Sequence, residues 1–173
     1  MNRFSFDAQP KALKTIRVGH DIRITVLTPC LLRVEKGSFT DLPTQTVWNR
    51  RFGEADFTHH MTAGKLVITT DETVFTLDVR SGEMISVLIS DGSMVTDFEK
   101  GNLLGTARTL DRVNGATKHE KGIISRSGVA VMDDSTSLLL EQDGRILPRE
   151  SCSDVYYFAY GHDYKRCLKD FSV

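Results

Sequence analysis

The chain has 173 residues, of which 40% are hydrophobic and 26% are charged, a balance typical of a globular domain with a single hydrophobic core. Its 22 lysine and arginine residues nearly cancel its 23 acidic residues, which excludes the basic surface that nucleic-acid binding needs. No apolar run approaches the roughly 20 residues of a membrane-spanning helix, and the N-terminus, MNRFSFD, lacks the order of a signal peptide. We therefore expect a soluble, cytoplasmic protein with no membrane partner.

The first strong strand signal lies in residues 20–34, HDIRITVLTPCLLRV. Ile22, Ile24 and Val26 alternate with polar residues until Pro29 interrupts the pattern, which then resumes. This alternation predicts two half-buried strands separated by a break.

More short strands follow, separated by turn residues such as Asp71-Glu72, Ser81-Gly82 and Asp143-Gly144. We expect them in residues 66–70, 73–79, 84–90, 129–132, 137–140 and 155–160. The first three should form an antiparallel meander. Because turn signals recur at the spacing of a β-sandwich, the predicted fold class is all-β, an antiparallel β-sandwich.

The C-terminal residues show a different periodicity. Tyr164, Cys167, Leu168 and Phe171 fall on one face of a helix, and Asp163 is suited to cap its N-terminus. We expect a short helix that ends with the chain, as a truncated connector would. The predicted division is therefore a sandwich domain over residues 1–160 and a connector helix over residues 161–173.

The three cysteines, Cys30, Cys152 and Cys167, are widely spaced and form no CxxC pair. They are predicted to be buried or inert thiols, not zinc ligands. His59 and His60 are adjacent, so on a strand they would face opposite sides and could not share a metal. We expect neither a metal ion nor a cofactor.

Three segments carry groups that could do chemistry. Asp133-Asp134-Ser135 could supply paired carboxylates for acid–base catalysis, but a hairpin turn is the favoured interpretation. Trp48 with Arg50 and Arg51 could form a sugar-stacking platform, although a lone tryptophan more often packs in a core or interface. Residues 108–115, RTLDRVNG, fit a functional loop and a plain hairpin equally well.

Three blocks of sequence are more specific than these patterns. They are residues 101–111, GNLLGTARTLD, residues 124–135, ISRSGVAVMDDS, and residues 156–164, YYFAYGHDY. In this order they resemble the N-terminal domain of glycoside hydrolase family 31, which includes α-glucosidases and α-xylosidases. The resemblance implies a galactose-mutarotase-like β-sandwich that packs, in the intact enzyme, on a β/α barrel of the same polypeptide.

The resemblance also implies what the chain lacks. Members of the family are retaining enzymes whose two catalytic aspartates lie on the barrel, and their nucleophile motif, WxDMNE, does not occur here. The chain is therefore expected to hold no catalytic residue and to lend a loop to the substrate entrance of an α-glucosidase acting on α-linked oligosaccharides. Asp111 and Asn114 are the substrate-proximal candidates, and a homo-oligomer is possible.

Two other classes of function remain open. A stand-alone carbohydrate-binding module would use the sandwich, Trp48 and the polar loop. A mutarotase-like epimerase would need a histidine and a glutamate as acid and base, for which His119-Glu120 is the nearest pair.

Overall fold

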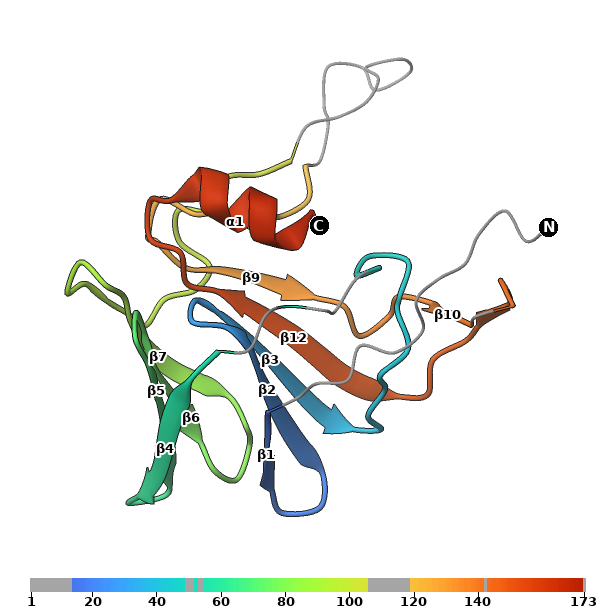
Figure 1. The fold of residues 1–173 in the computed structure, drawn as a ribbon, viewed down its shortest axis with the longest axis horizontal. Coiled ribbons are helices and arrows are strands. Elements are labelled where there is room, and N and C mark those ends of the chain that lie inside the picture. The colour runs from blue at the N-terminus through green and yellow to red at the C-terminus, as the bar shows by residue number, and fades with distance from the viewer. Residues whose placement is uncertain (1–13, 49–51, 53–54, 106–118, 142, 173) are drawn as a thin grey trace.

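The computed structural model describes residues 14–48, 52, 55–105, 119–141 and 143–172. Two five-stranded antiparallel sheets pack on each other, and a helix lies at the C-terminal end of the chain (Figure 1). The predicted class, an all-β antiparallel sandwich with a short C-terminal helix, is confirmed. In the part of the chain described, no helix has the length and apolar character required to cross a membrane.

The first sheet has the strand order β1-β2-β3-β12-β9. Its strands are β1 (Thr15–Val18), β2 (Ile22–Thr28), β3 (Leu31–Gly37), β12 (Cys152–Phe158) and β9 (Ala130–Asp133). The break predicted at Pro29 is the turn between β2 and β3. Strand β12 pairs with β3 along its whole length, so a late segment of the chain lies in the middle of a sheet begun at the N-terminus.

The second sheet is a meander with the order β4-β5-β6-β7-β8. Its strands are β4 (Phe57–Thr62), β5 (Lys65–Thr70), β6 (Val74–Asp78), β7 (Met84–Leu88) and β8 (Met94–Val95). The antiparallel meander predicted for the three middle strands is confirmed. A separate two-stranded ladder joins β10 (Leu139–Leu140) to β11 (Ile146–Leu147).

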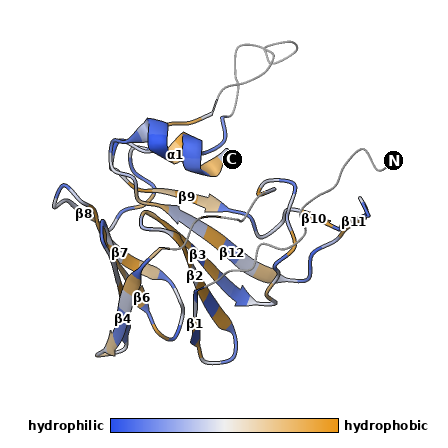
Figure 2. Cartoon of the chain, in the orientation of Figure 1, coloured by the Kyte–Doolittle hydropathy of each residue, from blue (hydrophilic) through white to orange (hydrophobic). Residues whose placement is uncertain are grey.

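The main hydrophobic core lies between the two sheets. Alternate residues of β2 and β3, such as Ile24 and Val34, pack in one cluster with Leu66, Phe75 and Val87 of the second sheet. Figure 2 shows hydrophobic residues spread along the strands of both sheets, beside a largely hydrophilic helix. Burial of alternate side chains is what period-two patterning produces when one face of a strand meets the core.

The opposite face of the first sheet is also covered, which corrects the prediction that β2 and β3 are half-buried. A second apolar cluster lies there, including Leu31, Tyr156, Phe158 and Cys167. All residues of β2 except the last are buried, so both faces of this strand are covered. The alternation in the sequence is real, but its polar residues are buried too: Arg23 lies against the segment that contains Phe39 and Thr40.

Helix α1 (Tyr164–Phe171) has the predicted cap, because the Asp163 carboxylate accepts a hydrogen bond from the Arg166 amide at 3.1 Å. Cys167 is buried, and the Phe171 ring meets Phe158 edge-on at 5.5 Å. Leu168, which we expected on the apolar face, is 49% exposed. The helix packs on the sandwich, and the division at residue 160 stays a prediction.

Candidate functional site

Asp111 and Asn114 lie in residues 106–118, outside the described residues. The two segments that carry this loop are described and are bonded to each other. The Leu103 amide donates to the Ile124 carbonyl at 2.9 Å, and the Gly105 amide donates to the Glu120 carbonyl at 2.9 Å. We call residues 101–105 and 120–126 the loop stem.

Asn102 closes the stem with its side chain. The Asn102 amide nitrogen donates to the Gly122 carbonyl at 2.8 Å, and its oxygen accepts from the Gly122 backbone amide at 2.8 Å. A Cβ on residue 122 would lie 2.3 Å from the Leu103 carbonyl oxygen. Only glycine allows this approach, so both residues are needed for the two segments to meet as they do.

A turn at residues 125–128 connects the stem to the first sheet. The Arg126 amide donates to the Gly101 carbonyl at 2.8 Å, and the Gly161 amide donates to the Gly128 carbonyl at 2.9 Å. Gly128 has a φ of 87°, and a Cβ there would lie 2.6 Å from the Ile89 side chain. The three family-like blocks, which are spread over residues 101–164, therefore meet at one place.

Helix α1 is fixed beside this stem by polar contacts of two adjacent residues, Arg166 and Cys167. The Cys167 thiol donates to the Ile123 carbonyl of the stem at 3.3 Å. Arg166 makes two bonds of 2.7 Å each to the Glu72 carboxylate, which belongs to the turn between β5 and β6. These Arg166 bonds lower the pKa of Glu72, against the opposing effect of its burial. The helix is thereby tied to the stem and to the second sheet.

The buried thiols and the tyrosine hydroxyl near the helix have raised pKa values. Burial, with the charge of Glu72 next in importance, raises the pKa of Cys30 to about 12. Burial likewise raises the pKa of Cys167 to about 12, and it also raises the pKa of Tyr160. Since the thiolate is the reactive form of cysteine, these residues do not resemble an activated nucleophile, and the prediction of inert thiols holds for both.

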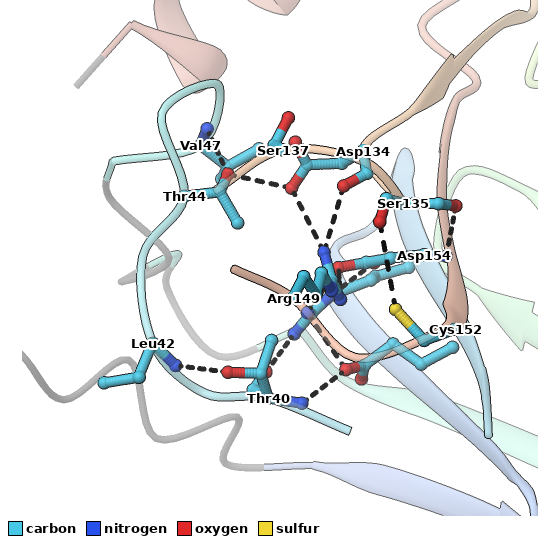
Figure 3. A network of polar contacts seen from close by, with 12 residues as sticks. Thr40, Leu42, Thr44, Val47, Asp134, Ser135, Ser137, Arg149, Cys152 and Asp154 are labelled. Carbon is cyan, nitrogen blue, oxygen red and sulfur yellow. Dashed lines mark hydrogen bonds and ion pairs between the residues drawn. The ribbon is translucent and has the colours of Figure 1, made fainter. Parts of the chain in front are cut away.

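A buried network of charges lies on the covered face of the first sheet (Figure 3). Arg23 on β2, Glu35 on β3 and Asp154 on β12 stand directly opposite one another across three strands. Glu35 and Asp154 would repel as cross-strand neighbours, but Arg33 places one nitrogen 2.9 Å from Glu35 and 2.7 Å from Asp154. A second arginine, Arg149, donates to Asp154 at 2.6 Å.

Three arginines meet three fully buried carboxylates in this network, because Arg149 Nη1 also lies 3.9 Å from Asp134. Burial acts to lower the pKa of Arg33, but its bond to Asp154 and the surrounding negative charge outweigh that effect and raise it. Arg23 and Arg33 also donate to the Thr40 carbonyl, at 2.9 and 3.1 Å. We therefore interpret the network as a structural support for the segment that begins at Thr40.

Asp133-Asp134-Ser135 is a turn, as predicted, but not a hairpin. The Asp133 carboxylate accepts from the Ser135 amide at 2.9 Å, whereas β9 pairs with β12 and β10 pairs with β11. Asp134 is fully buried and accepts from the Thr44 hydroxyl at 2.8 Å. The two carboxylates thus have separate structural roles, which argues against an acid–base pair.

Trp48 lies at the surface, so it does not pack in the core, and packing at a domain interface, the other part of the favoured expectation, stays a prediction. Its side chain is 58% exposed, and its indole nitrogen donates to the Gln45 carbonyl at 2.8 Å. Arg50 and Arg51, the other members of the expected sugar platform, lie outside the described residues. An exposed aromatic ring in a fixed orientation is a surface on which a sugar can stack.

The candidate histidines, His59, His60 and His119, are all exposed. His119 and Glu120 are both exposed at the base of the loop stem. His59 and His60 lie on β4, where they stand opposite Ile68 and Val67 on different faces, as the sequence predicts. Across the described ranges, no group of three or more histidine, cysteine or acidic residues is arranged to hold a metal ion.

The fold and site define an antiparallel two-sheet sandwich with the loop stem beside helix α1. No protein-family model matches the chain, and no curated protein matches it. Among solved structures, it is similar to the GH31 alpha-xylosidase from Xanthomonas citri, with a TM-score of 0.37 and 12% sequence identity. The similarity covers 73% of this chain and 16% of the α-xylosidase chain, and likeness at this level does not assign a family.

Proposed function

We propose that the chain is the non-catalytic N-terminal β-sandwich domain of a retaining α-glycosidase, with α-glucosidase as the first candidate activity of the intact enzyme. The observation that carries the proposal is the meeting of the three family-like blocks at the loop stem. Gly101 bonds to Arg126, and Gly128 bonds to Gly161. Residues that resemble one family in three separate stretches thus contribute to a single structural unit.

In this proposal the unit positions residues 106–118 at the entrance of an active site on a β/α barrel of the same polypeptide. Asp111 or Asn114 would then hydrogen-bond a hydroxyl of an α-linked oligosaccharide. The paired state of Glu35 and Asp154 supports a non-catalytic role, because a retaining mechanism needs one carboxylate free to attack and another able to donate a proton. A cytoplasmic location remains part of the proposal.

The test fuses the chain to a family 31 barrel from which the native sandwich has been removed. We expect the chain alone to leave a nitrophenyl α-glucoside intact, and the fusion to hydrolyse it. Asp111→Ala in the fusion should raise KM more than it lowers kcat, because the contact helps to bind the substrate and takes no part in the chemistry. Asp143→Ala, in the exposed turn between β10 and β11, is the matched control. Hydrolysis by the rigorously purified chain alone would overturn the proposal.

The exposure of Trp48 favours a second candidate, a stand-alone carbohydrate-binding module. This tryptophan is the only one in the chain, so its fluorescence reports on its surroundings without interference. A module of this kind predicts saturable quenching by maltose in the isolated chain and no binding by Trp48→Ala in calorimetry. The accessory-domain proposal predicts no saturable signal from the chain alone.

A further inference from the structure

Strand β4 forms one edge of the second sheet and is open on its outer side. It pairs with β5 along residues 57–62, and in the described part of the chain no other strand pairs with it. Every residue of β4 after Phe57 is exposed. The unpaired N–H and C=O groups of such an edge are a template for another strand.

The other edges of the two sheets are protected in ways that β4 is not. β8 has two residues, β1 has four residues and includes Arg17, and β9 has four residues and ends in Asp133. Short length and charge are the usual means of preventing edge pairing. β4 has six residues, FTHHMT, with no lysine, arginine, acidic residue or proline.

The side chains of β4 restrict which partner strand fits. Phe57, His59 and Met61 stand opposite residues of β5 that point into the core, such as Ile68, and the rings of Phe57 and His59 lie 6.2 Å apart. Residues paired across an antiparallel ladder point to the same face. A second copy of β4 that keeps its core-side residues on this face must therefore place the two-fold axis on a residue, not between two residues.

An axis on any residue of β4 satisfies this condition, but an axis at His59 or His60, the two central residues, pairs the largest part of the strand. Of these two, one gives the better contacts. An axis at His59 places Phe57 opposite Met61 of the second copy, twice by symmetry. An axis at His60 would instead place Phe57 beyond the end of the second strand, at the turn residue Ala63. Met61 is 55% exposed in the single chain, and a methionine against an aromatic ring is a favourable contact.

We propose that two copies of this chain associate by antiparallel pairing of their β4 strands about a two-fold axis at His59, which joins the second sheets of both copies into one. The contact is isologous and closes after two copies. It is independent of the proposed function, because the turn between β4 and β5 lies at the opposite end of the molecule from α1 and the loop stem (Figure 1).

The first test measures association by sedimentation equilibrium over a wide range of concentrations. Met61→Lys places a charge against Phe57 of the second copy, so it should yield monomers. Its unfolding midpoint should match that of the unaltered chain at concentrations where the latter is monomeric. The matched control is Met94→Lys, because Met94 is 66% exposed on β8 at the other edge of the same sheet; it should dimerise as the unaltered chain does. A chain that is monomeric at every concentration, or a Met61→Lys variant that still dimerises, overturns the proposal.

The second test examines the position of the axis by cross-linking in a Cys152→Ser background, since Cys30 and Cys167 are buried. Two residues facing each other on an axis have Cα atoms roughly 4.5–5.5 Å apart, within reach of a disulfide. His59→Cys should therefore give a covalent dimer on mild oxidation. His60→Cys, which faces Thr58 of the second copy, should give far less, and a greater yield from His60→Cys would overturn the assigned axis.

Discussion

Asp154→Asn is the sharpest test of the buried charge network. The two Asp154 oxygens accept from Arg33 Nε at 2.8 Å, Arg33 Nη2 at 2.7 Å and Arg149 Nη2 at 2.6 Å, and the residue is fully buried. Asparagine keeps the shape of the side chain but replaces one acceptor by a donor and removes the charge. Two buried guanidinium groups would then face an amide.

Removing one partner of a buried ion pair costs about 3–5 kcal/mol, against a total stability of about 5–15 kcal/mol for a domain. With a guanidinium m-value of about 2–6 kcal/mol per molar, the unfolding midpoint of Asp154→Asn should fall by about 1 M without a change in m. Denaturation followed by circular dichroism measures both quantities.

Asp143→Asn is the control for this experiment. Asp143 pairs with Arg145 at 2.5 Å, but both side chains are more than half exposed, so water replaces the lost contact and the midpoint should not move measurably. If Asp154→Asn unfolded at the same guanidinium concentration as Asp143→Asn, the network would contribute nothing through its charge, and our interpretation of it would be refuted.

Three further predictions concern the stem, the helix and the thiols. Gly122→Ala should lower the melting temperature by several degrees, from an overpacking cost of about 1–3 kcal/mol, whereas Gly105→Ala in the same stem meets nothing closer than 3.7 Å and should not. Glu72 has a lowered pKa in the folded state. Its ion pair therefore stabilises the fold fully above the usual glutamate pKa of about 4.3, and this stabilisation is lost as the pH falls through the lowered value. The difference in unfolding free energy between the unaltered chain and Glu72→Gln, measured by urea unfolding, should close over that pH range. Because the pKa values of Cys30 and Cys167 are raised to about 12, Ellman's reagent at pH 8 should titrate Cys152 alone in the folded chain and all three thiols in denaturant.

The strands with strong patterns could be predicted from sequence because burial on one face imposes a period of two. The predicted ranges 66–70 and 84–90 agree with β5 and β7 to within two residues at each end. The short strands β1, β8 and β11 have four residues or fewer, too few for a period to be detected. β4 has an alternation that is masked by two adjacent histidines, since His59 and His60 are similar in polarity.

The buried charges could not be predicted, because local patterning treats a charged residue in a strand as solvent-facing. Arg33 lies in the sequence LLRVEKG, where it looks like the exposed half of an alternating strand. Its partner Asp154 is 121 residues away, and no local signal connects the two. The loop stem could not be predicted either: residues 108–115 stand out in the sequence for their polar groups, whereas the close approach of Gly122 to Leu103 depends on three-dimensional packing.

The network and the loop stem are connected through the register of β12. Because side chains alternate along a strand, a slip of one residue against β3 would move Asp154 from the arginines into the apolar core between the sheets. The cost of an unpaired charge there is far larger than that of a mispaired apolar residue, so the charges oppose the slip more strongly than the hydrophobic pattern does. β12 continues into Gly161, whose amide bonds to Gly128 beneath the loop stem. The position of the stem on the sandwich therefore depends on charges at the far end of β12, and a register error in Asp154→Asn would appear as loss of the Gly161 amide's protection from hydrogen exchange.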